Sequence, residues 1–244
     1  LTWYDPSTNP ALCQYTSGWP DFVEYCDTPT ETYYFNGSVS GYARPTVAVS
    51  GTTTICNGQS TNVSFDFTGT APWNLTYTVN GTPVSITTSD DPHVLTVNPV
   101  VNTTYLATVL TDSHCTALAG DITGSAVITV NPTPMISFAF NGVEAGYNAS
   151  FAYCYDQPVG VTLYANYAGT EPFSVTYTLD GGTPITVSGL YVGDVIVAPQ
   201  QYTAGVHNVE VIDISDANGC HASEVFRDYC AATFNINALP VVTD

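Results

Sequence analysis

Seven cysteines carry the clearest chemistry that the sequence offers. They are Cys13, Cys26, Cys56, Cys115, Cys154, Cys220 and Cys230. None of the spacings matches a CxxC or Cys/His zinc loop, because His114-Cys115 and Cys220-His221 are adjacent pairs. Disulfide bonds are the remaining chemistry, and they persist in an oxidising compartment. Since the number is odd, at least one thiol stays free or pairs with another chain.

A second set of side chains could bind a hard cation. Asp213, Asp216 and Asn218 lie at short intervals in DISDANG, and closely spaced oxygen ligands suit calcium. An ordinary Asp/Asn-Gly turn accounts for the same residues. The sequence contains no GxSxG, HExxH or phosphate-loop motif. We therefore expect a protein that is not an enzyme and needs no cofactor other than this calcium candidate.

Most of these residues lie in an internal repeat. Residues 69–81 read GTAPWNLTYTVNG and residues 169–181 read GTEPFSVTYTLDG, and the two strings align without a gap. In the extended alignment Cys56 falls opposite Cys154, and Cys115 falls opposite Cys220. Such a repeat indicates two copies of one folding unit. We predict an N-terminal arm at residues 1–43, a first module at 44–133 and a second module with a C-terminal tail at 134–244.

Both copies predict β-strands. Hydrophobic and polar residues alternate across 73–79 and 173–179, which is typical of a strand with one face in a core, and Trp73 and Phe173 should hold equivalent core positions. Asn80-Gly81 and Asp180-Gly181 supply the positive φ of tight hairpins. Further strands are expected at 46–50, 61–67, 84–88, 94–98, 104–110 and 125–131, and at 136–140, 159–167, 185–187, 194–198, 206–214 and 231–237. The fold class is all-β, with two tandem Ig-like β-sandwiches after a largely extended arm.

Four strings of the first module, TTTICNGQS, GTAPWNLTYTVNG, TTYLATVLTD and ITVNPTP, carry a resemblance to a known family. They resemble the Ig-like/PKD-like repeats of secreted cell-surface and gliding-associated adhesins of Bacteroidota. The second module departs from the pattern, because it lacks the Asn-Gly after its first cysteine and inserts HASEVFRDYC around Cys230. The resemblance implies an Ig-like fold, export and surface display, and no catalytic motif.

The expected topology limits how the repeated cysteines can pair. Strands of five to nine residues span about 17–30 Å, whereas a disulfide needs Cα atoms within about 7 Å. Cys56 and Cys115 belong to opposite ends of one sandwich, so Cys56 would meet Cys220 and Cys154 would meet Cys115 of a following subunit. A different strand assignment would instead allow pairing inside each module, Cys56 with Cys115 and Cys154 with Cys220. Both schemes remain open at this point.

The arm is rich in aromatic residues. Those expected to take part in assembly are Trp3, Tyr4, Trp19, Phe22, Tyr33, Tyr34 and Phe35. They could anchor an extended arm in a groove, and residues 31–40 could add a strand to an exposed sheet edge. Carbohydrate stacking is the alternative. Cys13 and Cys26 are expected to pair with each other, and Cys220 with Cys230 is a further short pairing.

Charge limits the partners of the chain. Lys+Arg is 2 and Asp+Glu is 21, so the net charge is −19. This charge argues against nucleic acid and anionic membranes, which need a basic surface. The sequence has no signal peptide and no membrane-spanning apolar run, so we expect a mature, secreted chain at the cell surface. Asn-x-Ser/Thr triplets make it a candidate glycoprotein, at Asn36, Asn62, Asn74, Asn80, Asn102 and Asn148.

These features favour a structural subunit of an extracellular filament, sheath or surface layer. Its partners would be identical subunits in a homopolymer, joined head to tail through the arm and the module ends. A surface adhesin fragment that binds glycans or a host or abiotic surface is the alternative. A non-catalytic module of a secreted hydrolase is the third interpretation.

Overall fold

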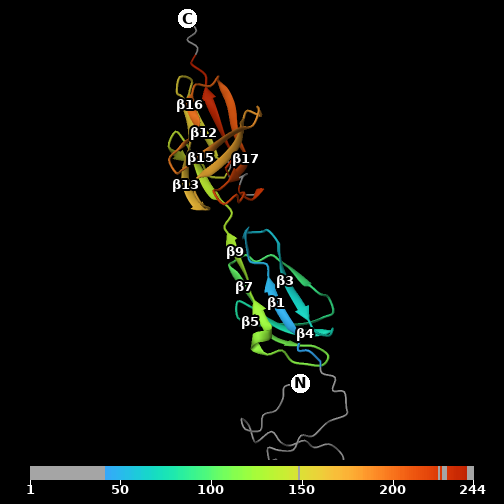
Figure 1. Ribbon diagram of the computed structural model, residues 1–244. Helices are drawn as coiled ribbons and strands as arrows, with labels where there is room; N and C mark the ends of the chain where they lie inside the picture. Colours follow the sequence, from blue (N-terminus) through green and yellow to red (C-terminus); the bar gives the residue numbers. More distant parts are fainter. Residues whose placement is uncertain (1–41, 148, 225, 227–229, 241–244) are drawn as a thin grey trace, which may run out of the picture. The chain divides into compact units, whose positions relative to one another are not determined.

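The computed structural model describes residues 42–147, 149–224, 226 and 230–240 (Figure 1). Nearly all of its regular structure is β, which confirms the predicted fold class. Every strand pairing within these residues joins two strands of β1–β9 or two strands of β10–β18. The predicted arm, apart from Tyr42 and Ala43, lies outside the described residues. None of the helices found there is long and apolar enough to cross a membrane.

The first module consists of two facing sheets. One has the strand order β6-β3-β1-β8 and the other the order β2-β9-β7-β4-β5. The strands are β1 (Thr46–Ser50), β2 (Thr53–Cys56), β3 (Thr61–Thr68), β4 (Trp73–Val79), β5 (Thr82–Thr88), β6 (His93–Val97), β7 (Thr103–Thr111), β8 (Ile122–Gly124) and β9 (Ala126–Asn131), with a 3-10 turn, η2 (Ala119–Asp121), before β8.

The second module repeats this plan. Its sheets have the orders β11-β10-β13-β16 and β12-β18-β17-β14-β15. The strands are β10 (Met135–Phe140), β11 (Val143–Glu144), β12 (Ala149–Cys154), β13 (Val159–Ala168), β14 (Phe173–Leu179), β15 (Ile185–Leu190), β16 (Val195–Gln200), β17 (Gly205–Ser215) and β18 (Ala232–Asn237). The five-stranded sheets of the two modules therefore have the same order, strand for strand.

Each module encloses its own core. Trp73 begins β4 and is 6% exposed, and Phe173 begins β14 and is 1% exposed. Trp73 stacks on Phe67 with ring centroids 5.0 Å apart, and its Nε1 donates to the Thr68 carbonyl at 3.0 Å. The predicted burial of both rings is confirmed. Burying an aromatic side chain of this size is among the largest stabilising contributions in a small domain.

Two strands missing from the sequence-based assignment carry cysteines. β2 and β12 each pair in parallel with the last strand of their module, with Cys56 opposite Asn131 and Cys154 opposite Asn237. In the first module Gly51, at φ 115°, separates β1 from β2, and a Cβ there would lie 2.4 Å from the Asn62 carbonyl oxygen. Glycine thus lets the chain pass from one sheet to the other at this point.

Candidate functional site

One disulfide joins the two modules within the described residues. It links Cys56, at the end of β2, to Cys220, which follows β17, and the Cα atoms are 5.5 Å apart. This distance is typical of a disulfide. Of the pairings left open by the sequence, the structure contains the one between modules. The proposed bond between Cys220 and Cys230 is absent because Cys220 is already paired.

Cys56 belongs to a turn at the end where the chain leaves the first module. It lies opposite Asn131, the last residue of β9, and the Asn57 N–H donates to the Asn131 carbonyl at 2.8 Å. The Gln59 N–H donates to the Cys56 carbonyl at 3.0 Å and closes the turn. We call residues 56–59 the trailing turn of the first module.

The second module has the same turn. Cys154 ends β12 opposite Asn237, the last residue of β18. The Gln157 N–H donates to the Cys154 carbonyl at 3.0 Å, the same distance as in the first module. We call residues 154–157 the trailing turn of the second module, and its thiol is exposed.

Cys220 belongs to a loop at the end where the chain enters the second module. Asp216 organises this loop, because its Oδ1 accepts from the N–H groups of Asn218 and Cys220, each at 2.9 Å. Its Oδ2 accepts from the Thr170 N–H at 3.0 Å. Thr170 follows Gly169, where a Cβ would lie 2.9 Å from the Cα of Pro134, just before β10. We call residues 216–220 the leading loop of the second module.

The leading loop of the first module, residues 112–115, is built in the same way. Asp112 Oδ2 accepts from the Thr70 N–H at 2.9 Å, and Oδ1 accepts from the N–H groups of His114 and Cys115 at 2.8 and 2.6 Å. These backbone donors stabilise the carboxylate and lower the pKa of Asp112. The Asp112 N–H donates to the Cys115 carbonyl at 2.9 Å, and the Asp216 N–H donates to the Cys220 carbonyl at 3.0 Å.

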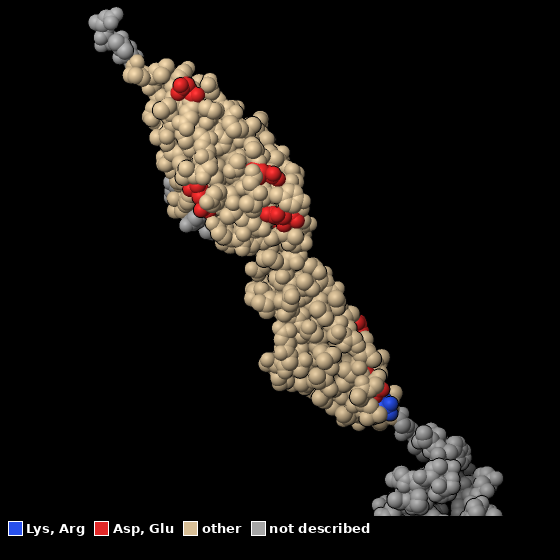
Figure 2. All heavy atoms as spheres, turned by 90° about the vertical axis from the view of Figure 1, so that its left-hand side faces the viewer, with Lys and Arg blue, Asp and Glu red and all other residues tan. Residues whose placement is uncertain are grey.

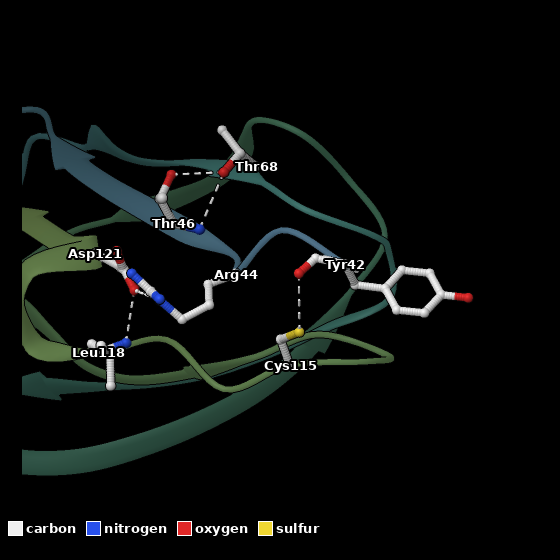
Figure 3. A network of polar contacts seen from close by, with 7 residues as sticks. All are labelled: Tyr42, Arg44, Thr46, Thr68, Cys115, Leu118 and Asp121. Carbon is white, nitrogen blue, oxygen red and sulfur yellow. Dashed lines mark hydrogen bonds and ion pairs between the residues drawn. The ribbon is translucent and has the colours of Figure 1, made fainter. Parts of the chain in front are cut away.

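Cys115 lies beside the segment that enters the first module (Figure 3). Its thiol lies 3.8 Å from the Tyr42 carbonyl oxygen, and the Tyr42 ring stacks on His114 with centroids 3.6 Å apart. Arg44 Nε donates to Asp121 Oδ2 at 2.8 Å, which holds the segment to the turn before β8. Cys115 is half-buried.

Cys230 differs from the other two cysteines that form no disulfide in the described part of the chain. It is buried, its Sγ donates to the Ile136 carbonyl at 3.4 Å, and burial raises its pKa to about 12. A thiol reacts as the thiolate, so Cys230 is unreactive near neutral pH. Of the other two described cysteines without a disulfide, Cys154 is exposed and Cys115 is half-buried.

Of the calcium candidates, Asp216 and Asn218 lie in the loop after β17, and Asp213 lies in β17 itself. Both carboxylate oxygens of Asp216 accept backbone N–H groups, and Asp213 Oδ2 lies 2.9 Å from His221 Nδ1. Asn218 Nδ2 donates to Thr170 Oγ1 at 2.8 Å. The side chains of all three residues therefore already have hydrogen-bond partners in the protein. Across the described residues no group of three or more His, Cys, Asp and Glu is placed to hold a metal ion.

A hollow of about 670 Å³ lies on the second module. Its lining includes Met135, Glu144, Tyr167 and Cys230. The Tyr167 hydroxyl donates to Glu144 Oε1 at 2.7 Å, so the carboxylate already has a protein partner. We assign the hollow no ligand.

Four of the candidate glycosylation sites are exposed in the structure. They are Asn62, Asn74, Asn80 and Asn102. Asn80 also holds its turn, because its Oδ1 accepts from the Thr104 N–H at 2.8 Å and its Nδ2 donates to the Asn102 carbonyl at 3.4 Å. The remaining candidates lie outside the described residues: Asn36, Asn148, Cys13, Cys26, Trp3, Tyr4, Trp19, Phe22, Tyr33, Tyr34 and Phe35.

The acidic residues are dispersed. On the face in Figure 2, Asp and Glu lie singly or in small groups among other side chains. Such a surface produces a general negative field rather than a focused binding patch.

Comparisons with known proteins found solved structures of low similarity. No protein-family model matches the sequence, and no curated protein matches it. Among solved structures, the I67–I69 fragment of titin matches with 15% identity and a TM-score of 0.43, over 80% of this chain and 66% of that one. Immunoglobulin domains 1–4 of Sidekick-1 match with 9% identity and a TM-score of 0.30, over 80% and 74% of the two chains.

A two-domain fibronectin type III segment of chicken tenascin matches with 16% identity and a TM-score of 0.25, over 74% of this chain and 95% of that one. The chain spans about two thirds of the titin fragment. None of these three proteins is a bacterial adhesin, so the expected tie to Bacteroidota gains no support from them. The sheet orders of the two modules, rather than these scores, identify the chain as a tandem of Ig-like sandwiches.

Proposed function

We propose that the chain is a structural subunit of an extracellular filament, sheath or surface layer in which identical subunits join head to tail. The observation that carries the proposal is the repetition of the two cysteine elements. Each module has a leading loop and a trailing turn with matching hydrogen bonds, and the inner pair already joins the two modules. The inner pair is Cys56 and Cys220. The outer pair, Cys115 in the first leading loop and Cys154 in the second trailing turn, would form the junction with the next subunit.

A contact between two different ends of one subunit is heterologous. Such contacts generate open filaments whenever the rotation from subunit to subunit does not close a ring. The connection between modules already brings a trailing turn to a leading loop through Cys56–Cys220. A junction between subunits would repeat a contact that the chain makes within itself.

Composition supports an extracellular, non-enzymatic role. A net charge of −19 gives repelling surfaces that oppose unspecific association. A disulfide between modules suits an oxidising compartment. The arm, residues 1–43, would add contacts to a neighbouring subunit through its aromatic residues.

Imaging of the purified chain tests this function. We expect negative-stain images of the full chain, concentrated under oxidising conditions, to contain long fibres of uniform width. A chain that starts at Tyr42 should keep its β-type circular dichroism spectrum and, under reducing conditions, stay monomeric in sedimentation. Full-length particles that remain single at every concentration would overturn the proposal. Fibres from the shortened chain would assign assembly to the modules alone.

A surface adhesin remains the second candidate, because the second module exposes several tyrosines. Tyr155, Tyr164, Tyr167 and Tyr191 are all exposed there. Exposed rings are suited to stacking on sugars. A glycan array probed with the chain from Tyr42 onward tests this reading, with Tyr164→Ser and Tyr191→Ser as variants. Binding that both substitutions leave unchanged would remove this support.

A further inference from the structure

We propose that Cys154 of one chain forms a disulfide with Cys115 of the next copy, so that the assembled polymer is covalent. The inference rests on the proposed function and specifies its partner surface. The surface consists of the trailing turn of the second module and the leading loop of the first, each on a different copy of the chain.

The cysteines correspond one to one between the modules. Cys154 occupies in the second trailing turn the place that Cys56 occupies in the first. Cys115 occupies in the first leading loop the place that Cys220 occupies in the second. The bond already present joins one trailing turn to one leading loop. Cys154 and Cys115, which this bond leaves unpaired, likewise belong to one trailing turn and one leading loop.

Pairing inside a module is excluded by the length of its strands. In the second module Ser215 of β17 bridges His221 beside Cys220, whereas Gly205 at the other end of β17 pairs with Ile236, next to the partner of Cys154. A strand of this length spans roughly 35 Å at about 3.3 Å per residue, and a disulfide joins Cα atoms less than about 7 Å apart. Cys154 and Cys220 therefore cannot meet within one sandwich.

The two outer cysteines, Cys115 and Cys154, are less buried than the bonded Cys220. Cys154 is exposed and Cys115 is half-buried, whereas Cys220, already bonded, is fully buried. The carboxylate of Asp112 fixes the N–H groups of its loop as Asp216 does in the second module. Cys115 is therefore presented on a backbone already shaped for a disulfide partner.

The second junction is similar to the first but not identical. Tyr155-Asp156 follow Cys154 where Asn57-Gly58 follow Cys56, and the first leading loop is shorter than the second. These differences alter the side chains around the bond and keep the hydrogen bond that closes each turn, from Gln59 or Gln157.

The bond forms by two thiol–disulfide exchanges with a small disulfide, such as glutathione disulfide, as oxidant. The Cys154 thiolate attacks one sulfur of the oxidant, which forms a mixed disulfide and releases one small thiol. The Cys115 thiolate of the next chain then attacks the Cys154 sulfur and releases the second small thiol. Two protein thiols are oxidised and one small disulfide is reduced to two thiols.

This pairing also accounts for the odd number of cysteines. Cys56 pairs with Cys220, and Cys13 is expected to pair with Cys26. With Cys115 bonded to Cys154 of a neighbour, Cys230 is left over. Among the described cysteines that form no disulfide, it is the buried one.

Complementary serine variants test the bond. Full-length wild type, Cys115→Ser, Cys154→Ser and the control Cys230→Ser are incubated in a glutathione redox buffer and run on a non-reducing gel. We expect a ladder of multimers from wild type and from Cys230→Ser. Cys115→Ser alone and Cys154→Ser alone should each give no species larger than a dimer. A mixture of the two should give dimers in which peptide mapping finds Cys154 of one variant bonded to Cys115 of the other.

Two results would overturn the disulfide. One is a full ladder from Cys154→Ser, and the other is a map in which Cys115 is bonded to Cys13 or Cys26. Electron microscopy of the same samples separates the two proposals. If Cys154→Ser forms fibres in the images but runs as a monomer on the gel, the covalent link is not needed for assembly, and the filament proposal stands. Wild type that is monomeric on the gel and in the images would overturn both.

Discussion

Asp112 and Asp216 hold the leading loops of two different modules with the same set of hydrogen bonds. Each carboxylate accepts one N–H from the loop before β4 or β14 and two from its own loop. A carboxylate that accepts hydrogen bonds from three backbone N–H groups fixes the conformation of the loop through local contacts. The cysteines that follow are positioned by these carboxylates.

Asp112→Ala should lower the melting temperature of the first module, because three N–H groups lose their acceptor. The backbone donors lower the pKa of Asp112 below 3.8. The stability they provide is therefore present above pH 3.8 and is lost as the pH falls through the lower, folded pKa. Thermal melts from pH 2 to pH 7 measure this. Asp66→Ala, an exposed residue of β3, is the control, and equal melting curves for the two variants would contradict the role of Asp112.

His207 should titrate above the usual range of histidine. Burial of its ring lowers the pKa, but the hydrogen bonds to the Asp180 carboxylate and the Thr203 carbonyl and the charge of Asp180 outweigh it, so the pKa is raised above 6.5. Nδ1 lies 2.6 Å from Asp180 Oδ2 and Nε2 lies 2.9 Å from the Thr203 oxygen, so both ring nitrogens face acceptors. NMR titration of the imidazole signals measures this pKa.

Asp180→Asn is the matched variant, because Asn80 holds the same turn in the first module. Its Oδ1 can still accept from the Asn208 N–H, as Asn80 accepts from Thr104. We expect the pKa of His207 to fall. The stability that the wild-type pair contributes is present below pH 6.5 and is lost as the pH rises through the folded pKa. An unchanged His207 titration in this variant would show that Asp180 is not the cause.

Phe173→Ala should destabilise the second module by about 3–5 kcal/mol, as is usual for a buried aromatic truncated to alanine. Trp73→Ala should cost the first module a similar amount, since both rings are almost fully buried. Urea unfolding followed by circular dichroism gives both values. Val206→Ala, at a residue 73% exposed, is the control and should change stability by less than about 0.5 kcal/mol. A cost below about 1 kcal/mol for either ring would contradict its place in the core.

Cys230 should resist alkylation in the folded chain. Burial raises its pKa to about 12 from an ordinary value of 9.0. The thiolate fraction at pH 8 is therefore lower about a thousandfold, before any loss of access. Iodoacetamide followed by peptide mapping should label Cys154 within minutes and Cys230 only after urea is added. Rapid labelling of Cys230 without urea would mean that the second module opens readily.

Local sequence patterns predicted the strands that have a full hydrophobic alternation. Both β4 and β14 have the predicted bounds, because alternation over 73–79 and 173–179 and the turn residues after them are local signals. β2 and β12 were missed because they pair in parallel with strands distant in sequence. β8 and β11 were missed because they have three and two residues, too few for a pattern.

The repeat aligned the cysteines correctly but could not choose their partners. The choice depends on which end of a sandwich each cysteine occupies, and β2 and β12 decide that for Cys56 and Cys154. The sequence left Asp213, Asp216 and Asn218 open to two interpretations, a calcium loop or an ordinary turn, because both use the same residue types. What separates them is the direction of the backbone N–H groups, which the sequence does not specify.

The Cys56–Cys220 bond also sets how far the chain can be drawn out. A pull on the backbone at Tyr42 and Pro240 is carried by residues 42–56, by the bond and by residues 220–240. At about 3.5 Å per residue these segments reach about 120 Å, whereas the reduced chain reaches about 690 Å over the same residues. Unfolding inside the covalent loop adds no length while the bond is intact. The maximum end-to-end length of the oxidised chain is therefore short, and it increases only when the Cys56–Cys220 bond is reduced.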